Sequence, residues 1–106
     1  MHHDEALQAF IQESRDLVER MEEALLSIEQ TPDDPEIINA IFRAAHTIKG
    51  SAGIFGLNHI VAFTHVAESV LDEVRRGHIR IDAALSSTLL SAGDHIKSLV
   101  DLLAMG

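Results

Sequence analysis

One short stretch, AHTIKGSAG at residues 45–53, contains four residues that could perform chemistry or admit a partner: His46, Lys49, Gly50 and Gly53. The apolar residues around them recur at helical spacing, so this stretch is predicted to be a helix with one side towards a core. The four residues fall within a sector of roughly 100° on the opposite, solvent-facing side. Lys49 supplies a flexible cation one turn from the imidazole. The pattern predicts a site that holds a phosphoryl group.

The two glycines are costly residues in a helix, because each destabilises it by about 1 kcal/mol relative to alanine. Small residues beside an imidazole let the backbone or active-site rim of another protein come near the ring. We therefore interpret Gly50 and Gly53 as giving a partner access to His46. The alternative is an ordinary surface histidine with glycines that mark the helix end, but Lys49 and a second polar cluster favour the phosphoryl site.

This second cluster lies on the next predicted helix, where His65, Glu68 and Asp72 recur at helical spacing beside the apolar side. In an antiparallel pair of helices these residues can lie against the side that carries His46. A carboxylate there accepts the proton of one ring nitrogen, which leaves the lone pair of the other nitrogen free to attack. Glu68 is the candidate for this role. The alternative is an ordinary half-exposed surface, or a local pair worth only a few tenths of a kcal/mol.

Four amphipathic segments must position these residues, with turn residues between them. The predicted helices span about residues 5–30, 35–54, 58–76 and 82–103. Because the connections are short, successive helices should run antiparallel. The sequence therefore predicts an all-α fold, an antiparallel up-down-up-down four-helix bundle that forms a single domain over residues 1–106.

Capping residues support these boundaries. Asp34, followed by Pro35, is a good N-cap for the second helix, and Asn58 and Asp82 can cap the third and fourth. Gly77 suits the left-handed position after the third helix. Gly93 lies inside the fourth predicted helix without an evident reason.

The composition narrows the class of protein. The 106 residues can bury a core without disulfides, and the absence of cysteine removes the common zinc sites. Seventeen acidic residues against eight basic ones give a formal net charge of −9, which argues against nucleic-acid binding. There is no apolar run of transmembrane length, so we expect a cytoplasmic protein without membrane insertion. Seven histidines invite a metal site, but no zinc or di-iron ligand motif is present, and we expect no metal.

Four segments carry a resemblance to a known family: FRAAHTIKGSAG (42–53), FG (55–56), THVAE (64–68) and LDEVRRG (71–77). Together they resemble the histidine phosphotransfer (HPt) domain at the N-terminus of chemotaxis kinases of the CheA type. The resemblance covers nearly the whole chain. The histidine–lysine–glycine pattern is shared with other HPt domains, whereas the pattern of the third helix points to the chemotaxis kinases.

The resemblance implies that His46 accepts the γ-phosphoryl group of ATP from a histidine kinase catalytic domain and passes it to an aspartate on the receiver domain of a response regulator. It also implies that Glu68 hydrogen-bonds His46 and that Lys49 and His65 complete a polar network. No nucleotide-binding motif is present in the sequence. We therefore expect a substrate and carrier without a cofactor of its own, with ATP and Mg²⁺ supplied by the kinase and regulator partners.

The remaining domains of such a kinase are absent, so we expect a fragment of a multidomain histidine kinase, monomeric as an isolated domain. A stand-alone phosphorelay HPt protein is the alternative within the same family. Two other classes stay open at this point. One is a structural bundle that binds a helix through an apolar patch around Phe42, Ile54 and Phe55, and the other is a metal-binding bundle.

Overall fold

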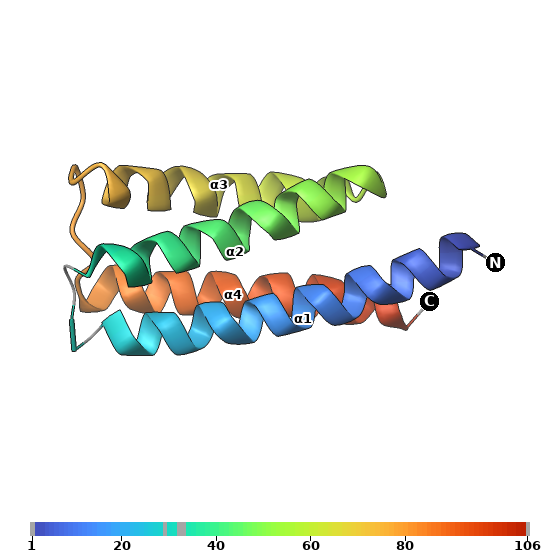
Figure 1. The fold of residues 1–106 in the computed structure, drawn as a ribbon, viewed down its shortest axis with the longest axis horizontal. Helices are drawn as coiled ribbons and strands as arrows, with labels where there is room; N and C mark the ends of the chain where they lie inside the picture. The colour runs from blue at the N-terminus through green and yellow to red at the C-terminus, as the bar shows by residue number, and fades with distance from the viewer. Residues whose placement is uncertain (1, 29, 32–33, 106) are drawn as a thin grey trace.

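Four long helices make up the fold. The computed structural model describes residues 2–28, 30–31 and 34–105, with side chains from residue 5 onward. The helices are α1 (His2–Ile28), α2 (Pro35–Ile54), α3 (Asn58–Arg75) and α4 (Ala83–Ala104). They lie side by side along the long axis, and both termini lie at the same end (Figure 1). No strand occurs in the described part of the chain, so the predicted all-α, antiparallel four-helix bundle is confirmed.

The helices form a ring in which each packs on the neighbours before and after it. α2 lies between α1 and α3, while α4 closes the ring against α1 and, less closely, against α3. Long aliphatic side chains from all four helices meet inside it, among them Leu25, Ile41, Leu71 and Ile96, none of which is exposed to solvent. Burial of each such side chain stabilises the fold by about 1.5–3 kcal/mol. No described helix has the length and apolar character needed to cross a bilayer.

The helix bounds lie close to the predicted ones. α2 has the predicted bounds, whereas α1 begins at His2 instead of about residue 5 and ends at Ile28. The predicted end at about residue 30 lies beyond Glu29, which is outside the described residues. Asp34 and Asp82 are N-caps as predicted, because each side chain accepts a hydrogen bond from a backbone N–H in the first turn of its helix.

The connection between α2 and α3 differs from the prediction. Gly56 adopts a left-handed conformation with φ 67°, and the Leu57 N–H donates to the Ala52 carbonyl at 3.0 Å. This pair of features ends α2 in a Schellman motif. The turn makes Leu57 the N-cap of α3, without a side-chain cap bond, and Asn58 the first helical residue. The prediction that Asn58 caps α3 was wrong, because the half-buried Leu57 packs on the core and fixes where the helix begins.

Gly77 after α3 behaves as predicted. Its φ of 81° is left-handed, and the His78 N–H donates to the Glu73 carbonyl at 2.9 Å. A second Schellman motif therefore ends α3. This sharp end directs the chain towards Asp82 and the start of α4.

Gly93 is buried where α4 packs on α1. A Cβ added there would lie 3.9 Å from Val18 Cγ1 and 3.9 Å from Glu22 Cγ, which is ordinary van der Waals contact. Because the backbone is helical and the space exists, we expect Gly93→Ala to raise the free energy of unfolding by about 0.5–1 kcal/mol. Chemical denaturation would measure this change. A loss of stability would mean that α1 and α4 pack too closely for a methyl group.

Candidate functional site

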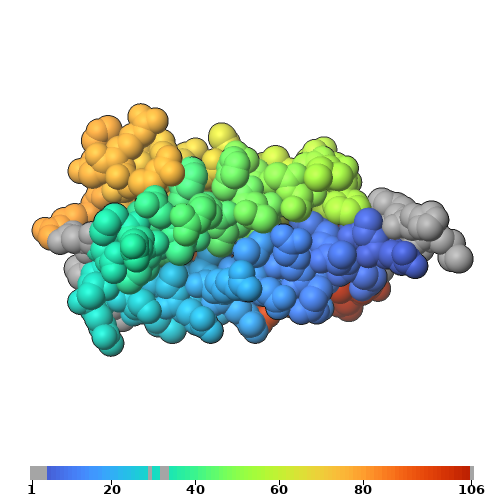
Figure 2. Space-filling view, viewed as in Figure 1, coloured from blue at the N-terminus to red at the C-terminus, as the bar shows by residue number. Residues whose placement is uncertain are grey.

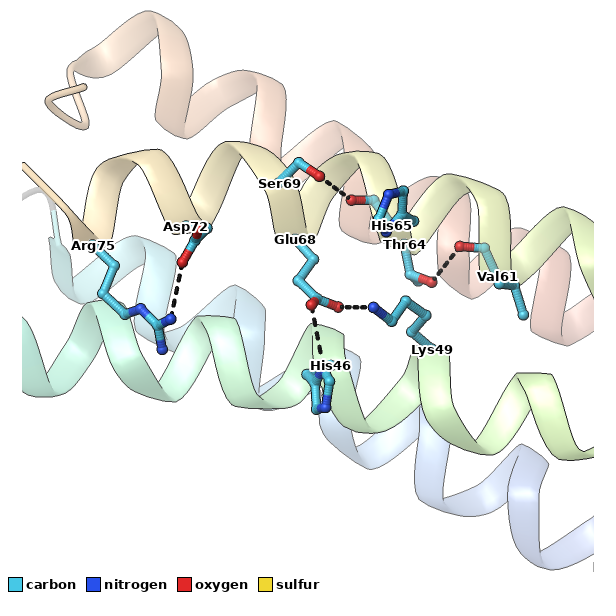
Figure 3. A network of polar contacts seen from close by, with 9 residues as sticks. All are labelled: His46, Lys49, Val61, Thr64, His65, Glu68, Ser69, Asp72 and Arg75. Carbon is cyan, nitrogen blue, oxygen red and sulfur yellow. Dashed lines mark hydrogen bonds and ion pairs between the residues drawn. The ribbon is translucent and has the colours of Figure 1, made fainter. Parts of the chain in front are cut away.

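The packing of α2 on α3 places a histidine and a lysine of α2 around one glutamate of α3 (Figure 3). His46 Nδ1 lies 3.2 Å from Glu68 Oε1, and Lys49 Nζ lies 2.9 Å from Glu68 Oε2. The buried sides of the two helices fix this geometry. Ala45 and Ile48 are buried on α2, and Ala67 is buried on α3, so the residues next to them meet at the rim of the core.

Exposure differs sharply among these three side chains. The His46 side chain is 62% exposed, whereas that of Glu68 is only 14% exposed and that of Lys49 is 23% exposed. The carboxylate is thus held between α2 and α3, while the imidazole extends into solvent. His46 is available to a partner on the side away from Glu68.

The charge of Glu68 follows from its neighbours. Burial raises the pKa of its carboxyl group, but the ion pair with Lys49 and the hydrogen bond with His46 outweigh burial, and the net pKa is below its usual value. The group is therefore ionised at neutral pH and can only accept hydrogen bonds. A neutral His46 must then carry its proton on Nδ1, which leaves the Nε2 lone pair free. This arrangement suits a nucleophile that attacks through Nε2.

An aromatic ring lies next to the imidazole, and an arginine packs on that aromatic ring. The Phe42 ring is parallel to that of His46, with an interplanar angle of 6° and ring centroids 6.2 Å apart. The Arg75 guanidinium lies 4.0 Å from the Phe42 centroid and pairs with Asp72 at 2.9 Å. Sequence reasoning missed both neighbours. Phe42 precedes His46 by four residues, so helical spacing alone could have found it, whereas Arg75 meets it only through the packing of α3 on α2.

The structure does not bring His65 into this group. Its side chain is exposed on α3 and forms no hydrogen bond or ion pair with any described residue. Its backbone carbonyl accepts a hydrogen bond from Ser69 Oγ at 2.9 Å (Figure 3). The part of His65 in a polar network therefore stays a prediction from the family resemblance.

Gly50 and Gly53 lie exposed on α2, on the side that carries His46. A Cβ added at either position would meet no atom within 4 Å, and neither residue has a positive φ. Nothing in the described part of the molecule therefore requires glycine at these positions. This result agrees with an external reason for them, namely the close approach of a partner.

The structure gives little support to the two alternative classes, a structural bundle that binds a helix and a metal-binding bundle. Of the predicted apolar patch, Ile54 is 83% exposed, but Phe42 and Phe55 are half-buried against the core. Among the described residues, no three His, Cys, Asp or Glu side chains are grouped so that they could hold a metal ion.

Comparison with known proteins gives one consistent family. The Hpt domain family model matches residues 5–105. The chemotaxis protein CheA of Borreliella burgdorferi is 38% identical over 96% of this chain and 12% of the relative, and that of Bacillus subtilis is 34% identical over 100% of this chain and 16% of the relative. This chain thus spans less than a fifth of the length of these curated relatives.

Solved structures agree in fold. The CheA phosphotransferase domain from Thermotoga maritima superposes with a TM-score of 0.91 at 34% identity, over 96% of this chain and 97% of that one. The phosphorylated P1 domain of CheA3 in complex with CheY6 from R. sphaeroides gives a TM-score of 0.89 at 25% identity, over 96% of this chain and 80% of that one.

Proposed function

This chain belongs to the Hpt domain family, and on that premise we propose that it is the phosphoacceptor and phosphocarrier domain of a chemotaxis signalling kinase. His46 accepts a phosphoryl group from the ATP-bound kinase domain and passes it to an aspartate of a response regulator. The main support for His46 as the phosphorylated residue is one observation: Glu68 binds Nδ1 of His46, while the His46 side chain remains 62% exposed. The ring is oriented by the fold and is also open to a second protein.

The reaction follows from this geometry. The Nε2 lone pair attacks the γ-phosphorus of ATP, the bond from that phosphorus to the bridging oxygen breaks, and ADP leaves with the electron pair. The ring becomes positively charged, and the Nδ1–H donated to Glu68 stabilises that charge. In the second step an aspartate carboxylate attacks the same phosphorus, and the N–P bond breaks to return a neutral imidazole. Lys49 lies one turn away and balances phosphoryl charge in both steps.

The partners follow from the same proposal. A histidine kinase catalytic domain supplies ATP and Mg²⁺, and the receiver domain of a response regulator supplies the acceptor aspartate. The solved complex of a related P1 domain with CheY6 supports a response regulator as the partner that accepts the phosphoryl group. The domain itself acts without a cofactor or metal, as a cytoplasmic part of a larger histidine kinase, and is a monomer when isolated. A stand-alone phosphorelay protein would use His46 in the same way.

Labelling tests the proposal directly. The domain is incubated with the catalytic fragment of a CheA-type kinase and γ-labelled ATP, and the label is then exposed to acid and to base. We expect one phosphoryl group that is labile in acid and stable in base, as a phosphorus–nitrogen bond requires. Loss of the label on addition of a CheY-type regulator would show the second step. No label with a competent kinase would contradict the proposal.

Gly50→Ala should separate access from stability. Alanine favours the helix by up to about 1 kcal/mol, and its methyl group meets no atom of this molecule. The same methyl group stands one turn from His46 and obstructs a partner, so we expect transfer to the regulator to slow roughly tenfold. Gly93→Ala is the matched control, because it adds the same methyl group far from His46 and should leave transfer unchanged. A Gly50→Ala domain that transfers normally would contradict the access role.

A further inference from the structure

Two arginines on the side of α2 away from Glu68 play no part in the proposed site. Arg20 of α1 and Arg43 of α2 line one hollow of about 330 Å³ where these helices meet. Figure 2 shows the surface over this seam between α1 and α2. The other lining residues are uncharged, namely Leu17, Ala40, Ala44 and Thr47.

Both side chains are exposed and form no hydrogen bond or ion pair with any residue from 5–28, 30–31 or 34–105. Four other cations of the chain have carboxylate partners, namely Arg15 with Asp101, Lys49 with Glu68, and Arg75 and Arg76 with Asp72. Carboxylates are abundant in this chain, which has 17 acidic residues and a net charge of −9. Two guanidinium groups that have no partner in the described part of the chain therefore form, at one hollow, a local positive site that suits a carboxylate from another molecule.

The position of Arg20 and Arg43 indicates which molecule supplies the carboxylate. Arg43 precedes His46 by three residues, so the two are neighbours on the surface of α2. A protein that covers the imidazole to reach Nε2 must therefore also cover Arg43. Under the proposed function the acceptor protein reacts through an aspartate, so its reacting surface carries negative charge.

We propose that Arg20 and Arg43 dock the response regulator by pairing with acidic side chains at the rim of its acceptor site. This inference rests on the proposed function and adds how the acceptor is recognised. The arginines hold the regulator on the α1 side of His46, while Glu68 and Lys49 act on the α3 side. Because the pair is exposed, its main effect is on the rate of association, and salt weakens that effect.

The experiment uses Arg20→Glu and Arg43→Glu, singly and together. Each domain is phosphorylated with the kinase fragment, and transfer to a CheY-type regulator is timed at a regulator concentration below saturation. We expect transfer by the double variant to slow at least about tenfold in low salt, and this defect to shrink at about 0.5 M salt. Loading of His46 is measured with saturating kinase, so that association does not limit the rate, and should stay within about twofold of the unaltered domain.

Lys97→Glu is the matched control for the single variants. It inverts one exposed charge on α4, which lies diagonally across the bundle from α2, and should transfer normally. Transfer by both arginine variants equal to that of Lys97→Glu would overturn the inference. A defect confined to loading would also overturn it, because the pair would then serve the kinase. A chain that cannot be labelled contradicts the proposed function and the inference with it, whereas normal labelling with unaffected transfer contradicts the inference alone.

Discussion

His46→Gln is expected to reduce phosphorylation to the background of the assay. The glutamine side chain has nearly the length of histidine, but its amide nitrogen has no free lone pair and cannot attack the γ-phosphorus. The fold should remain, because the His46 side chain is 62% exposed and a surface substitution of this kind changes stability by about 0.5 kcal/mol or less. Labelling with γ-labelled ATP beside a thermal unfolding curve measures both effects.

His65→Gln is the control for this experiment. His65 is also an exposed histidine, on the neighbouring helix, but no described residue orients its ring. The His65→Gln variant should still be phosphorylated fully and at a single site. A change in its rate of phosphorylation would measure any contribution of His65 to the polar network around His46. Label that survives in His46→Gln and is lost in His65→Gln would move the phosphorylated residue to α3.

Glu68→Gln should slow phosphorylation of His46 by roughly 10- to 100-fold without unfolding the domain. At metal sites, the loss of a carboxylate that orients a histidine has an effect of this size, and we expect the same for a histidine that acts as a nucleophile. The amide keeps the shape of the side chain but loses the negative charge that stabilises the developing imidazolium. It can also donate to the ring as well as accept from it, so the preference for a proton on Nδ1 is lost. Single-turnover labelling with saturating kinase would measure the change in rate.

Nitrogen NMR of the imidazole separates this mechanism from a general loss of structure. We expect the proton on Nδ1 in the unaltered domain and a mixture of tautomers in Glu68→Gln. Asp72→Asn is the matched control, since it makes the same chemical change one turn further along α3, where the carboxylate pairs with Arg75 and Arg76. A Glu68→Gln domain with an unchanged rate would remove the tautomer argument.

The lowered pKa of Glu68 also fixes the sign of a pH effect on stability. Its pKa is below the ordinary value of 4.5 in the folded state, so its contacts with His46 and Lys49 stabilise the fold above that value. This contribution is lost as the pH falls through the folded pKa. The difference in unfolding free energy between the unaltered domain and Glu68→Gln should therefore be present at neutral pH and vanish in acid. A difference that grows in acid would contradict the assigned charge state.

Much of the fold could be predicted because its signals are local. Helical spacing of apolar residues predicted four helices close to their observed bounds, and Asp34, Asp82 and Gly77 marked helix ends correctly. Each of these signals depends on residues within a few positions of one another. The prediction for Asn58 was wrong because the packing of Leu57 on the core decides where α3 begins.

The sequence by itself determined the candidate nucleophile and its nearest neighbours on one helix. His46, Lys49 and Gly50 share a side of α2 because helical geometry repeats every 3.6 residues, so their proximity requires no knowledge of the rest of the chain. The sequence also indicated Glu68, as a carboxylate at helical spacing on the next predicted helix, but its contact with His46 depends on the α2–α3 packing. Only the structure shows that one carboxylate contacts both His46 and Lys49.

The tertiary structure alone decided the contacts that join separate helices. Arg75 lies over Phe42, and Arg20 shares a hollow with Arg43, although each pair is more than twenty residues apart in sequence. Such contacts depend on the rotation and register of one helix against another, which the whole core fixes through close packing. Apolar spacing shows which side of a helix is buried, but not which residue of the next helix lies opposite. The chemistry of the site was therefore readable in the sequence, whereas its electrostatic surroundings were set by the assembled bundle.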